Sequence, residues 1–135
     1  MPERLEDVHH IGIAVKNLED SKKIYCEILG LECIAESTLP ERGVKVAFLE
    51  TGNTKIELIE GISEDSPVSK FIERSGPGVH HLSFEVEDIS RVLKELADAG
   101  VRIIDEEPRP GAEGKLVAFI HPKSTSGVLI ELTEK

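Results

Sequence analysis

The stretch Val8-His9-His10-Ile11-Gly12-Ile13-Ala14-Val15 has a second copy, Val79-His80-His81-Leu82-Ser83-Phe84-Glu85-Val86, which lies 71 residues further along the chain. Each copy is followed, later in its half, by nearly the same closing residues: Ile56-Glu57-Leu58-Ile59-Glu60 in the first half and Ile130-Glu131-Leu132-Thr133-Glu134 in the second. A repeat on this scale indicates that one supersecondary unit is used twice. The chain therefore consists of two modules, each of which opens with His and closes with Glu.

The first module predicts the order strand, helix and three strands. Residues 8–15 alternate in the way that a half-buried strand does. Asn17 is a typical residue to begin a helix, and Gly30 is a typical residue to end one. The apolar face of this helix is expected at Ile24, Ile28 and Leu29. Strands are expected near 31–38, 43–50 and 54–60, with a hairpin turn at Thr51-Gly52-Asn53.

The second module repeats this order. A strand is expected over about 79–86, and Asp88 predicts the start of a helix that ends at Gly100. The apolar stripe of this helix is formed by Ile89, Val92, Leu93, Leu96 and Ala97. Strands are expected near 101–104, 115–121 and 127–133, and the stretch from Glu107 to Gly114, with two prolines and two glycines, is expected to be a loop.

These elements define the predicted fold, an α+β protein in which two tandem βαβββ modules form a curved mixed sheet around a shared cleft. We expect a single domain over residues 1–135, with the first module at about 8–60 and the second at about 79–133. Residues 61–78 are expected to link the modules and to contain a short helix from about Pro67 to Arg74.

Strand alternation places two His and two Glu on one surface. Neighbouring side chains of a strand point to opposite faces. Ile11, Ile13 and Val15 are apolar and share one face, which is expected to be the face that the helix covers. His10 points the other way and is therefore expected on the cleft side. The same argument, applied to the other three strands, places His81, Glu57 and Glu131 on the cleft side.

Two imidazoles and two carboxylates form a ligand set that suits a divalent ion of the Zn, Co, Ni, Mn or Fe type. An isolated His or Glu in a strand is more often an ordinary polar residue, but here the same types recur at matching positions of both modules. Without a cation, two carboxylates in the cleft would repel each other. The sequence therefore predicts a metal cleft with the ligands His10, Glu57, His81 and Glu131. His9 and His80 are expected to have structural roles, and His121, at a strand end before Pro122, is expected to be a loop residue, with contact to the substrate as the alternative.

Composition and charge exclude several classes of protein. The 135 residues carry a net charge of −10, which disfavours binding to nucleic acid. No apolar run approaches the roughly 18 residues of a membrane span, and the first residues lack the apolar stretch of a secretory signal. We therefore expect a cytoplasmic protein that binds neither nucleic acid nor membranes, with Cys26 and Cys33 as reduced thiols.

Three stretches resemble the methylmalonyl-CoA epimerases, a family of the vicinal oxygen chelate superfamily. They are Val8–Val15, Gly78–Phe84, and His121-Pro122-Lys123-Ser124 with the residues Gly127–Leu132 that follow it. The resemblance covers nearly the whole chain, and the third stretch is the most specific to the epimerases. It implies a vicinal oxygen chelate domain and a homodimeric enzyme of propionate metabolism that interconverts (2R)- and (2S)-methylmalonyl-CoA.

The resemblance also implies a site and a mechanism. The metal ligands of the family map onto His10, Glu57, His81 and Glu131, the set that the alternation selects. The implied cofactor is a divalent ion, expected to be Co²⁺, with Zn²⁺, Ni²⁺ or Mn²⁺ as alternatives. A 1,1-proton transfer through a metal-stabilised enolate needs two bases, which we expect to be Glu131 and either Glu57 or a bound water. Some members have Glu where this chain has Val46. Lys115 and Lys123 are expected to be solvated rather than bound to coenzyme A phosphates.

Two alternative functions remain open. One is a glyoxalase-type lyase or another vicinal oxygen chelate enzyme, such as a ring-cleaving dioxygenase, that shares all or part of the ligand set. The other is a metal-free protein that binds a small molecule and does not need the four ligands. Assays with methylglyoxal and glutathione, oxygen uptake, and the metal content of the purified protein distinguish these functions.

Overall fold

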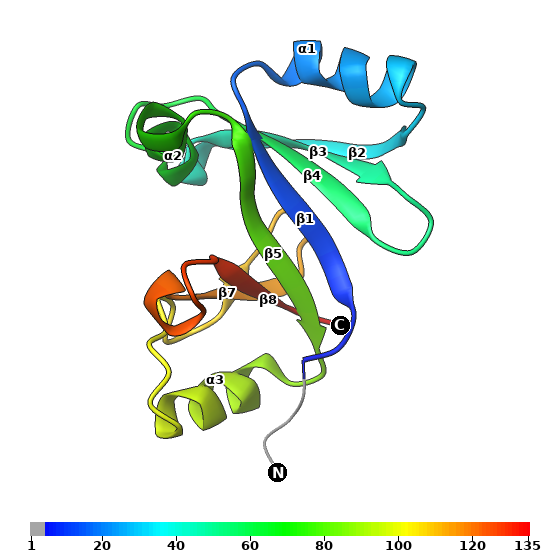
Figure 1. Cartoon of the computed structure of the whole chain (residues 1–135). Helices are drawn as coiled ribbons and strands as arrows, with labels where there is room; N and C mark the ends of the chain where they lie inside the picture. The colour runs from blue at the N-terminus through cyan, green and yellow to red at the C-terminus, as the bar shows by residue number, and fades with distance from the viewer. Residues whose placement is uncertain (1–4) are drawn as a thin grey trace. The chain divides into compact units, whose positions relative to one another are not determined.

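The computed structural model describes residues 5–135, which divide into two compact units (Figure 1). The first unit is His10–His80, and the second consists of His81–Lys135 together with residues 5–9. Within residues 5–135, every helix is too short or too polar to cross a membrane.

The first unit contains a mixed sheet with the strand order β2-β3-β4-β1. Strands β1 and β4 are parallel, whereas β3 is antiparallel to both β2 and β4. The elements are β1 (Val8–Val15), α1 (Leu18–Lys22), the π-helical turn η1 (Lys23–Ile28), β2 (Glu32–Leu39), the 3₁₀ turn η2 (Pro40–Arg42), β3 (Val44–Glu50), β4 (Lys55–Gly61) and α2 (Pro67–Ser75). The predicted strand, helix and three-strand order is confirmed, as is the short helix that follows it.

The second unit repeats this topology with the strand order β5-β8-β7-β6. Strands β5 and β8 are parallel, and β7 is antiparallel to β6 and β8. The elements are β5 (Gly78–Val86), α3 (Ile89–Asp98), β6 (Arg109–Pro110), β7 (Leu116–Ile120), the 3₁₀ turn η3 (Pro122–Ser124) and β8 (Ile130–Glu134). The α+β class and the tandem βαβββ order are therefore confirmed.

The predicted apolar face of the first helix is wrong. Ile24, Ile28 and Leu29 are 50%, 73% and 61% exposed, whereas Tyr25 and Cys26 pack against the core. The cause is the π-helical turn, in which the amide of Leu29 donates to the carbonyl of Ile24, five residues back. This wider turn rotates the side chains that follow Lys22, so the phase of an α-helix does not apply to them.

The predicted strand at 101–104 is also wrong, because only Ile103 forms a bridge, opposite Ile120. The amide of Phe119 donates a hydrogen bond to the carboxylate of Asp105, at 2.8 Å, rather than to a backbone carbonyl of the segment 101–105. The ladder therefore stops there. The third strand of the module is instead β6, which lies inside the stretch 107–114 that was expected to be a loop.

The repeated closing residues have two distinct uses. In each module the second Glu accepts a hydrogen bond from the first amide of the module's own helix: Glu60 from Leu18 at 2.7 Å, and Glu134 from Ile89 at 3.0 Å. A carboxylate at this position satisfies an unpaired amide and complements the helix dipole. The predicted caps are confirmed as well, since the side chains of Asn17 and Asp88 accept from the amides three residues further on.

Candidate functional site

In the first unit, His10 and Glu57 lie side by side on the face of the sheet opposite the packed core. Val15 of β1 and Leu58 of β4 belong to the core. Glu57 precedes Leu58, so its side chain points to the opposite face of the sheet. His10 Nε2 is 3.3 Å from Glu57 Oε1, and the two side chains are only 5% and 9% exposed. Phe48 pairs with Glu57 across β3 and β4, and its ring meets the His10 ring edge-on at 5.6 Å and 85°.

In the second unit, His81 and Glu131 have the same relationship. His81 Nε2 is 3.8 Å from Glu131 Oε1, and both side chains are buried. Phe119 pairs with Glu131 across β7 and β8, and its ring meets the His81 ring at 5.6 Å and 85°. The core of this unit lies on the opposite face and includes Leu132. The two units therefore carry the same His, Glu and Phe arrangement.

Each pair has a separation that suits two ligands of one metal ion. Ligand bonds of about 2.1 Å at tetrahedral or right angles put neighbouring ligand atoms about 3.0–3.5 Å apart. The 3.3 Å of His10 and Glu57 falls in this range, and the 3.8 Å of His81 and Glu131 requires a closure of a few tenths of an ångström. Buried imidazole nitrogens and carboxylate oxygens are also donors that borderline divalent ions accept. The donor chemistry therefore fits the predicted cofactor.

Two buried side chains beside the second pair support the strands that carry it. Ser83 follows His81 by two residues and Thr133 follows Glu131 by two residues. Their hydroxyl oxygens are 2.6 Å apart, and Ser83 is completely buried. Because a buried hydroxyl needs a partner, this hydrogen bond ties β5 to β8 next to His81 and Glu131.

Val46, which stands where some relatives have Glu, is 2% exposed and lies on β3 opposite Ile59 of β4. It shares its face with Phe48, two residues further on, and with Glu57. Position 46 therefore provides an apolar side chain to this face, and the carboxylate that the face carries nearby is that of Glu57.

The three histidines outside the predicted ligand set have other partners. His9 Nε2 is 3.2 Å from Glu113 Oε1, and the His80 ring meets the Phe71 ring at 5.0 Å. His121 precedes the turn η3, and its Nδ1 accepts a hydrogen bond from the amide of Lys123.

Sequence reasoning missed Phe48 and Phe119. Both were treated as ordinary strand residues, although they are separated by 71 residues, the separation of His10 and His81. That shared offset was the available signal. Aromatic edges packed on the two imidazoles hold the rings in one orientation and exclude water from them.

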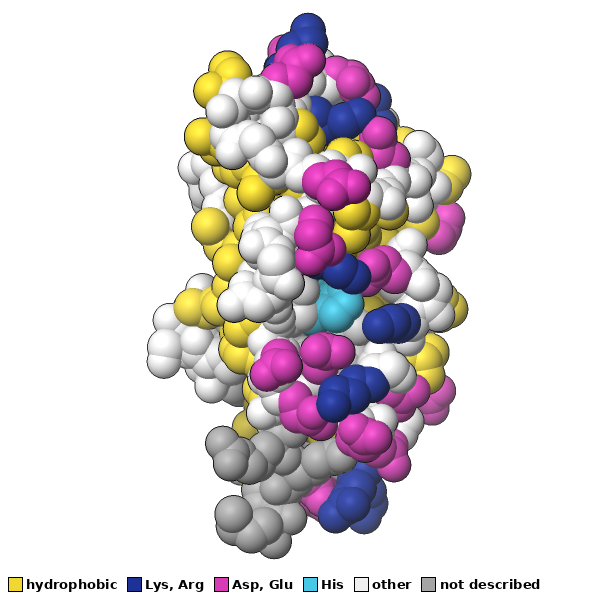
Figure 2. All heavy atoms as spheres, turned by 90° about the vertical axis from the view of Figure 1, so that its right-hand side faces the viewer, with side chains coloured by type: hydrophobic (Ala, Val, Ile, Leu, Met, Phe, Trp, Pro, Cys, Tyr) yellow, Lys and Arg dark blue, Asp and Glu magenta, His cyan; other side chains and the backbone are white. Residues whose placement is uncertain are grey.

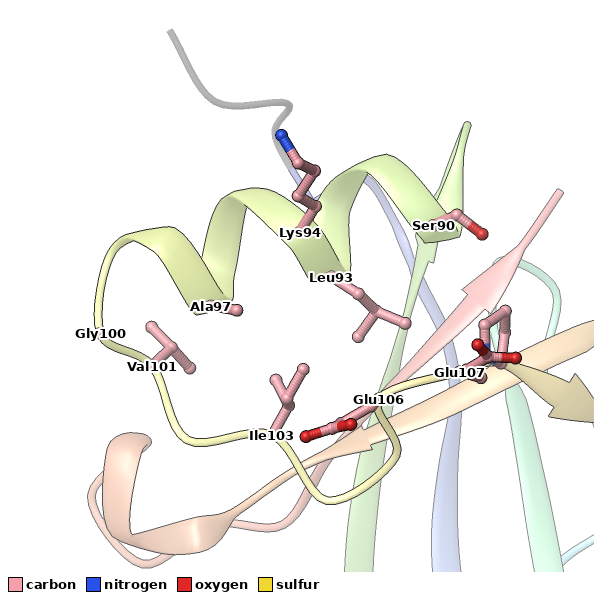
Figure 3. Close-up of a pocket in the computed structure, with 10 residues that line it drawn as sticks. Ser90, Leu93, Lys94, Ala97, Gly100, Val101, Ile103, Glu106 and Glu107 are labelled. Carbon is pink, nitrogen blue, oxygen red and sulfur yellow. The ribbon is translucent and has the colours of Figure 1, made fainter.

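The second unit also has a hollow between α3 and the segment 100–108 (Figure 3). Leu93, Val101 and Ile103 face into it, and Lys94 points away from it in this view. Its lining includes none of the four predicted ligands. It lies against the helix face of the sheet, so it is separate from the face that carries His81 and Glu131.

Comparisons with known proteins show the family to which the chain belongs. Residues 9–119 match the Glyoxalase/Bleomycin resistance protein/Dioxygenase superfamily. The chain is 46% identical to the protein YqjC of Bacillus subtilis, covering 93% of this chain and 89% of that one. It is 42% identical to an ethylmalonyl-CoA/methylmalonyl-CoA epimerase of Cereibacter sphaeroides, covering 94% of this chain and 96% of that one. A solved structure of a methylmalonyl-CoA epimerase in complex with methylmalonyl-CoA and NH4+ is 35% identical, with a TM-score of 0.92 over 98% of this chain and 96% of that chain.

Proposed function

Because the chain belongs to the Glyoxalase/Bleomycin resistance protein/Dioxygenase superfamily, we propose that it is a metal-dependent epimerase that interconverts (2R)- and (2S)-methylmalonyl-CoA. The relatives named as methylmalonyl-CoA epimerases and the donor chemistry of the two units support this proposal. The observation that carries it is the duplicated arrangement of a buried His beside a buried Glu, with an aromatic ring on each imidazole.

We propose that both pairs bind one divalent ion, with His10, Glu57, His81 and Glu131 as its ligands. We also propose that residues 1–135 act as a single vicinal oxygen chelate domain. His10, His81 and Glu131 are buried side chains of types that hold metal ions, which supports this assignment. Burial favours a bound cation, because two carboxylates without one would carry uncompensated charge away from water.

The reaction requires removal and return of the hydrogen at C2, which lies between a thioester and a carboxylate. When bound, the ion supplies a Lewis acid for the negative charge that develops on the substrate. We assign Glu131 as the group that takes the proton from one side of C2. Its buried carboxylate is held beside His81 and on the strand that Ser83 and Thr133 tie in place. A fixed base avoids the cost of orientation during the reaction.

Inversion needs a second group on the opposite side of C2. We assign Glu57, because Val46 cannot transfer a proton and Glu57 is the buried carboxylate of the first unit on that face. A bound water is the alternative to Glu57 in this role. Glu57→Gln distinguishes them: loss of epimerisation with retained exchange on one side of C2 supports Glu57, and unchanged epimerisation supports the water.

The proposal is tested by following the C2 hydrogen of methylmalonyl-CoA in deuterated water with added Co²⁺. We expect Glu131→Gln to lower by about 10³-fold the exchange rate of the epimer whose C2 hydrogen faces Glu131, within the usual contribution of a general base. Glu87→Gln, which changes an exposed carboxylate of the same unit, should leave the rate unchanged. Wild-type exchange in the Glu131 variant would remove Glu131 from the role of base.

Metal dependence is tested separately. Chelation should abolish activity, and one equivalent of a divalent ion should restore it. We propose Co²⁺, with Zn²⁺, Ni²⁺ and Mn²⁺ as alternatives that the same titration ranks. Full activity in protein shown to be free of metal would contradict the proposed role of the ion. Turnover of the hemithioacetal of methylglyoxal and glutathione, or oxygen uptake with a catechol, would identify one of the other superfamily reactions.

We further propose that the enzyme is a cytoplasmic homodimer that serves propionate metabolism. The exposed Ile24, Ile28 and Leu29 of the first unit support a homodimer, because apolar side chains grouped on a surface mark contact regions. Sedimentation equilibrium should give twice the mass of the chain, and Ile28→Glu should lower that value. Fractionation of the source cells tests the location.

A further inference from the structure

The connection between β7 and β8 is longer than its counterpart between β3 and β4. Glu57 follows Phe48 by nine residues, whereas Glu131 follows Phe119 by twelve. The extra residues form the turn η3, which holds the His-Pro-Lys-Ser motif and has no counterpart in the first module. The repeat keeps its helix caps and its 71-residue offset as far as Phe119, and it is extended after Phe119, in the connection that leads to Glu131.

Three basic residues gather at this turn. The carbonyl of Arg102 accepts a hydrogen bond from the amide of His121 at 2.9 Å, and the amide of Arg102 donates to Ser124 Oγ at 2.8 Å. The amide of Lys123 donates to His121 Nδ1 at 3.0 Å. Backbone and side-chain hydrogen bonds thus hold Arg102, His121 and Lys123 in one place, although Arg102 is distant from the other two in the sequence.

The cluster lies on the face of the sheet that carries Glu131. His121 directly follows β7 and keeps an extended backbone, with φ −66° and ψ 133°, so it shares a face with Phe119. Phe119 in turn pairs with Glu131. Two residues of a strand span about 6.6 Å. His121 is therefore that far along the strand direction from Phe119, the residue that pairs with the proposed base Glu131.

The positive charge of the cluster is available for a ligand. In residues 5–135, Arg102 and Lys123 form no ion pair, whereas Arg91, Arg109 and Lys135 of the same unit do. Burial and the neighbouring charges of Arg102 and Lys123 lower the pKa of His121. Its imidazole is therefore neutral near pH 7, and because Nδ1 accepts a hydrogen bond, the proton is on Nε2, which can donate.

The overall charge of the protein makes such a cluster necessary for an anionic substrate. The chain carries a net charge of −10, and Figure 2 shows acidic side chains spread along one face with basic ones among them. A coenzyme A ester carries a pyrophosphate and a 3′-phosphate, which this charge repels. Local cations beside the reacting centre overcome that repulsion and guide the ester to it.

We propose that Arg102, His121 and Lys123 form the binding site for the phosphate groups of the coenzyme A ester. This inference rests on the proposed function, and it reverses the expectation that Lys123 is merely solvated. Arg102 offers a planar group for two phosphate oxygens, Lys123 offers a mobile point charge, and His121 offers a neutral N–H donor. The substrate class is an acyl ester whose phosphates lie at the end of a flexible pantetheine arm.

The test compares ligands that differ only in their phosphates. Binding of coenzyme A to the metal-free full chain is measured by calorimetry for the wild type, Arg102→Gln, Lys123→Gln and the double variant. We expect the Kd to rise about threefold for each single change and about tenfold for both. Lys94→Gln, which removes an exposed charge from α3 of the same unit, should leave the Kd within a factor of two. Dephospho-coenzyme A then separates the 3′-phosphate from the pyrophosphate.

Epimerisation gives the second readout. The double variant should lose about tenfold in kcat/KM on methylmalonyl-CoA and nothing on methylmalonyl-pantetheine, which has no phosphate. Equal losses on both esters, or an unchanged Kd for coenzyme A, would overturn the inference. The two proposals can fail separately. If the wild type epimerises neither ester, the proposed function is refuted. If the double variant still binds coenzyme A more weakly than the wild type in that case, the phosphate site is supported.

Discussion

The hydrogen bond between Ser83 and Thr133 is expected to contribute strongly to the free energy of unfolding, because both hydroxyls are buried. Ser83 is 0% and Thr133 is 3% exposed, and their oxygens are 2.6 Å apart. In Thr133→Val, Ser83 keeps its hydroxyl in a place that water does not reach. A buried polar group that loses its partner costs about 1–3 kcal/mol. We therefore expect Thr133→Val to lower the free energy of unfolding by about 2 kcal/mol.

The companion variants turn this expectation into a coupling measurement. Ser83→Ala should cost about 1–2 kcal/mol, because it leaves the Thr133 hydroxyl without its partner. The double variant Ser83→Ala/Thr133→Val removes both hydroxyls and should cost no more than about 1 kcal/mol. The singles together then exceed the double by about 2 kcal/mol, which is the range found for directly bonded pairs.

The assay is urea unfolding of chelated protein, so that bound metal does not add to the stability. For a chain of this size, 2 kcal/mol corresponds to a fall in Tm of about 8 °C. Additive effects of the two changes would refute the reasoning, because they would mean that neither hydroxyl depends on the other. The same variants should bind Co²⁺ more weakly, since the bond holds the strands of His81 and Glu131 together.

Three further predictions follow from packing and burial. In Gly61→Ala the added Cβ would meet Ser69 Oγ and lie 3.0 Å from the Ser69 amide, so urea unfolding should show a loss of about 2 kcal/mol; unchanged stability would mean that α2 does not pack on Gly61. Phe48→Ala, at a residue 3% exposed, should cost about 3–5 kcal/mol in the same assay, and Phe119→Ala should cost less because Phe119 is half-buried; the reverse order would contradict the burial argument. Burial raises the pKa of the Cys26 thiol, so at pH 8 iodoacetamide should react with Cys26 more slowly in the folded protein than in protein unfolded in urea. The folded state then keeps a proton that the unfolded state releases, so the free energy of unfolding should fall as the pH rises past the ordinary thiol pKa. Equal alkylation rates in the two states would argue against burial of this thiol.

Local rules account for what could be predicted. Alternation along a strand depends only on the backbone, so the repeat was enough to assign His10, Glu57, His81 and Glu131 to one face of each strand. Helix starts depend on a side chain and an amide three residues away, so Asn17 was also predictable. The hairpin turn at Thr51-Gly52-Asn53, which joins β3 to β4, was predictable from its turn residues.

The remaining features depend on hydrogen bonds that depart from the regular pattern of a helix or a strand. The π-helical turn changes the phase after Lys22 and exposes Ile28, which no α-helical period describes. Asp105 replaces a backbone carbonyl opposite Phe119 and ends a predicted strand. Both effects arise because hydrogen bonds are chosen among neighbours that only the folded chain brings together.

The sequence by itself therefore determined the two modules, their strand faces and the residue types of the proposed metal site, because each follows from a short-range period. Only the tertiary structure decided which side chains touch them. It put Phe48 and Phe119 edge-on against the imidazoles, gave the second closing Glu of each module to a helix cap, and brought Arg102 to the turn that holds His121. Contacts between strands are set by register and packing across the sheet, and a linear pattern carries that information only where the repeat exposes it.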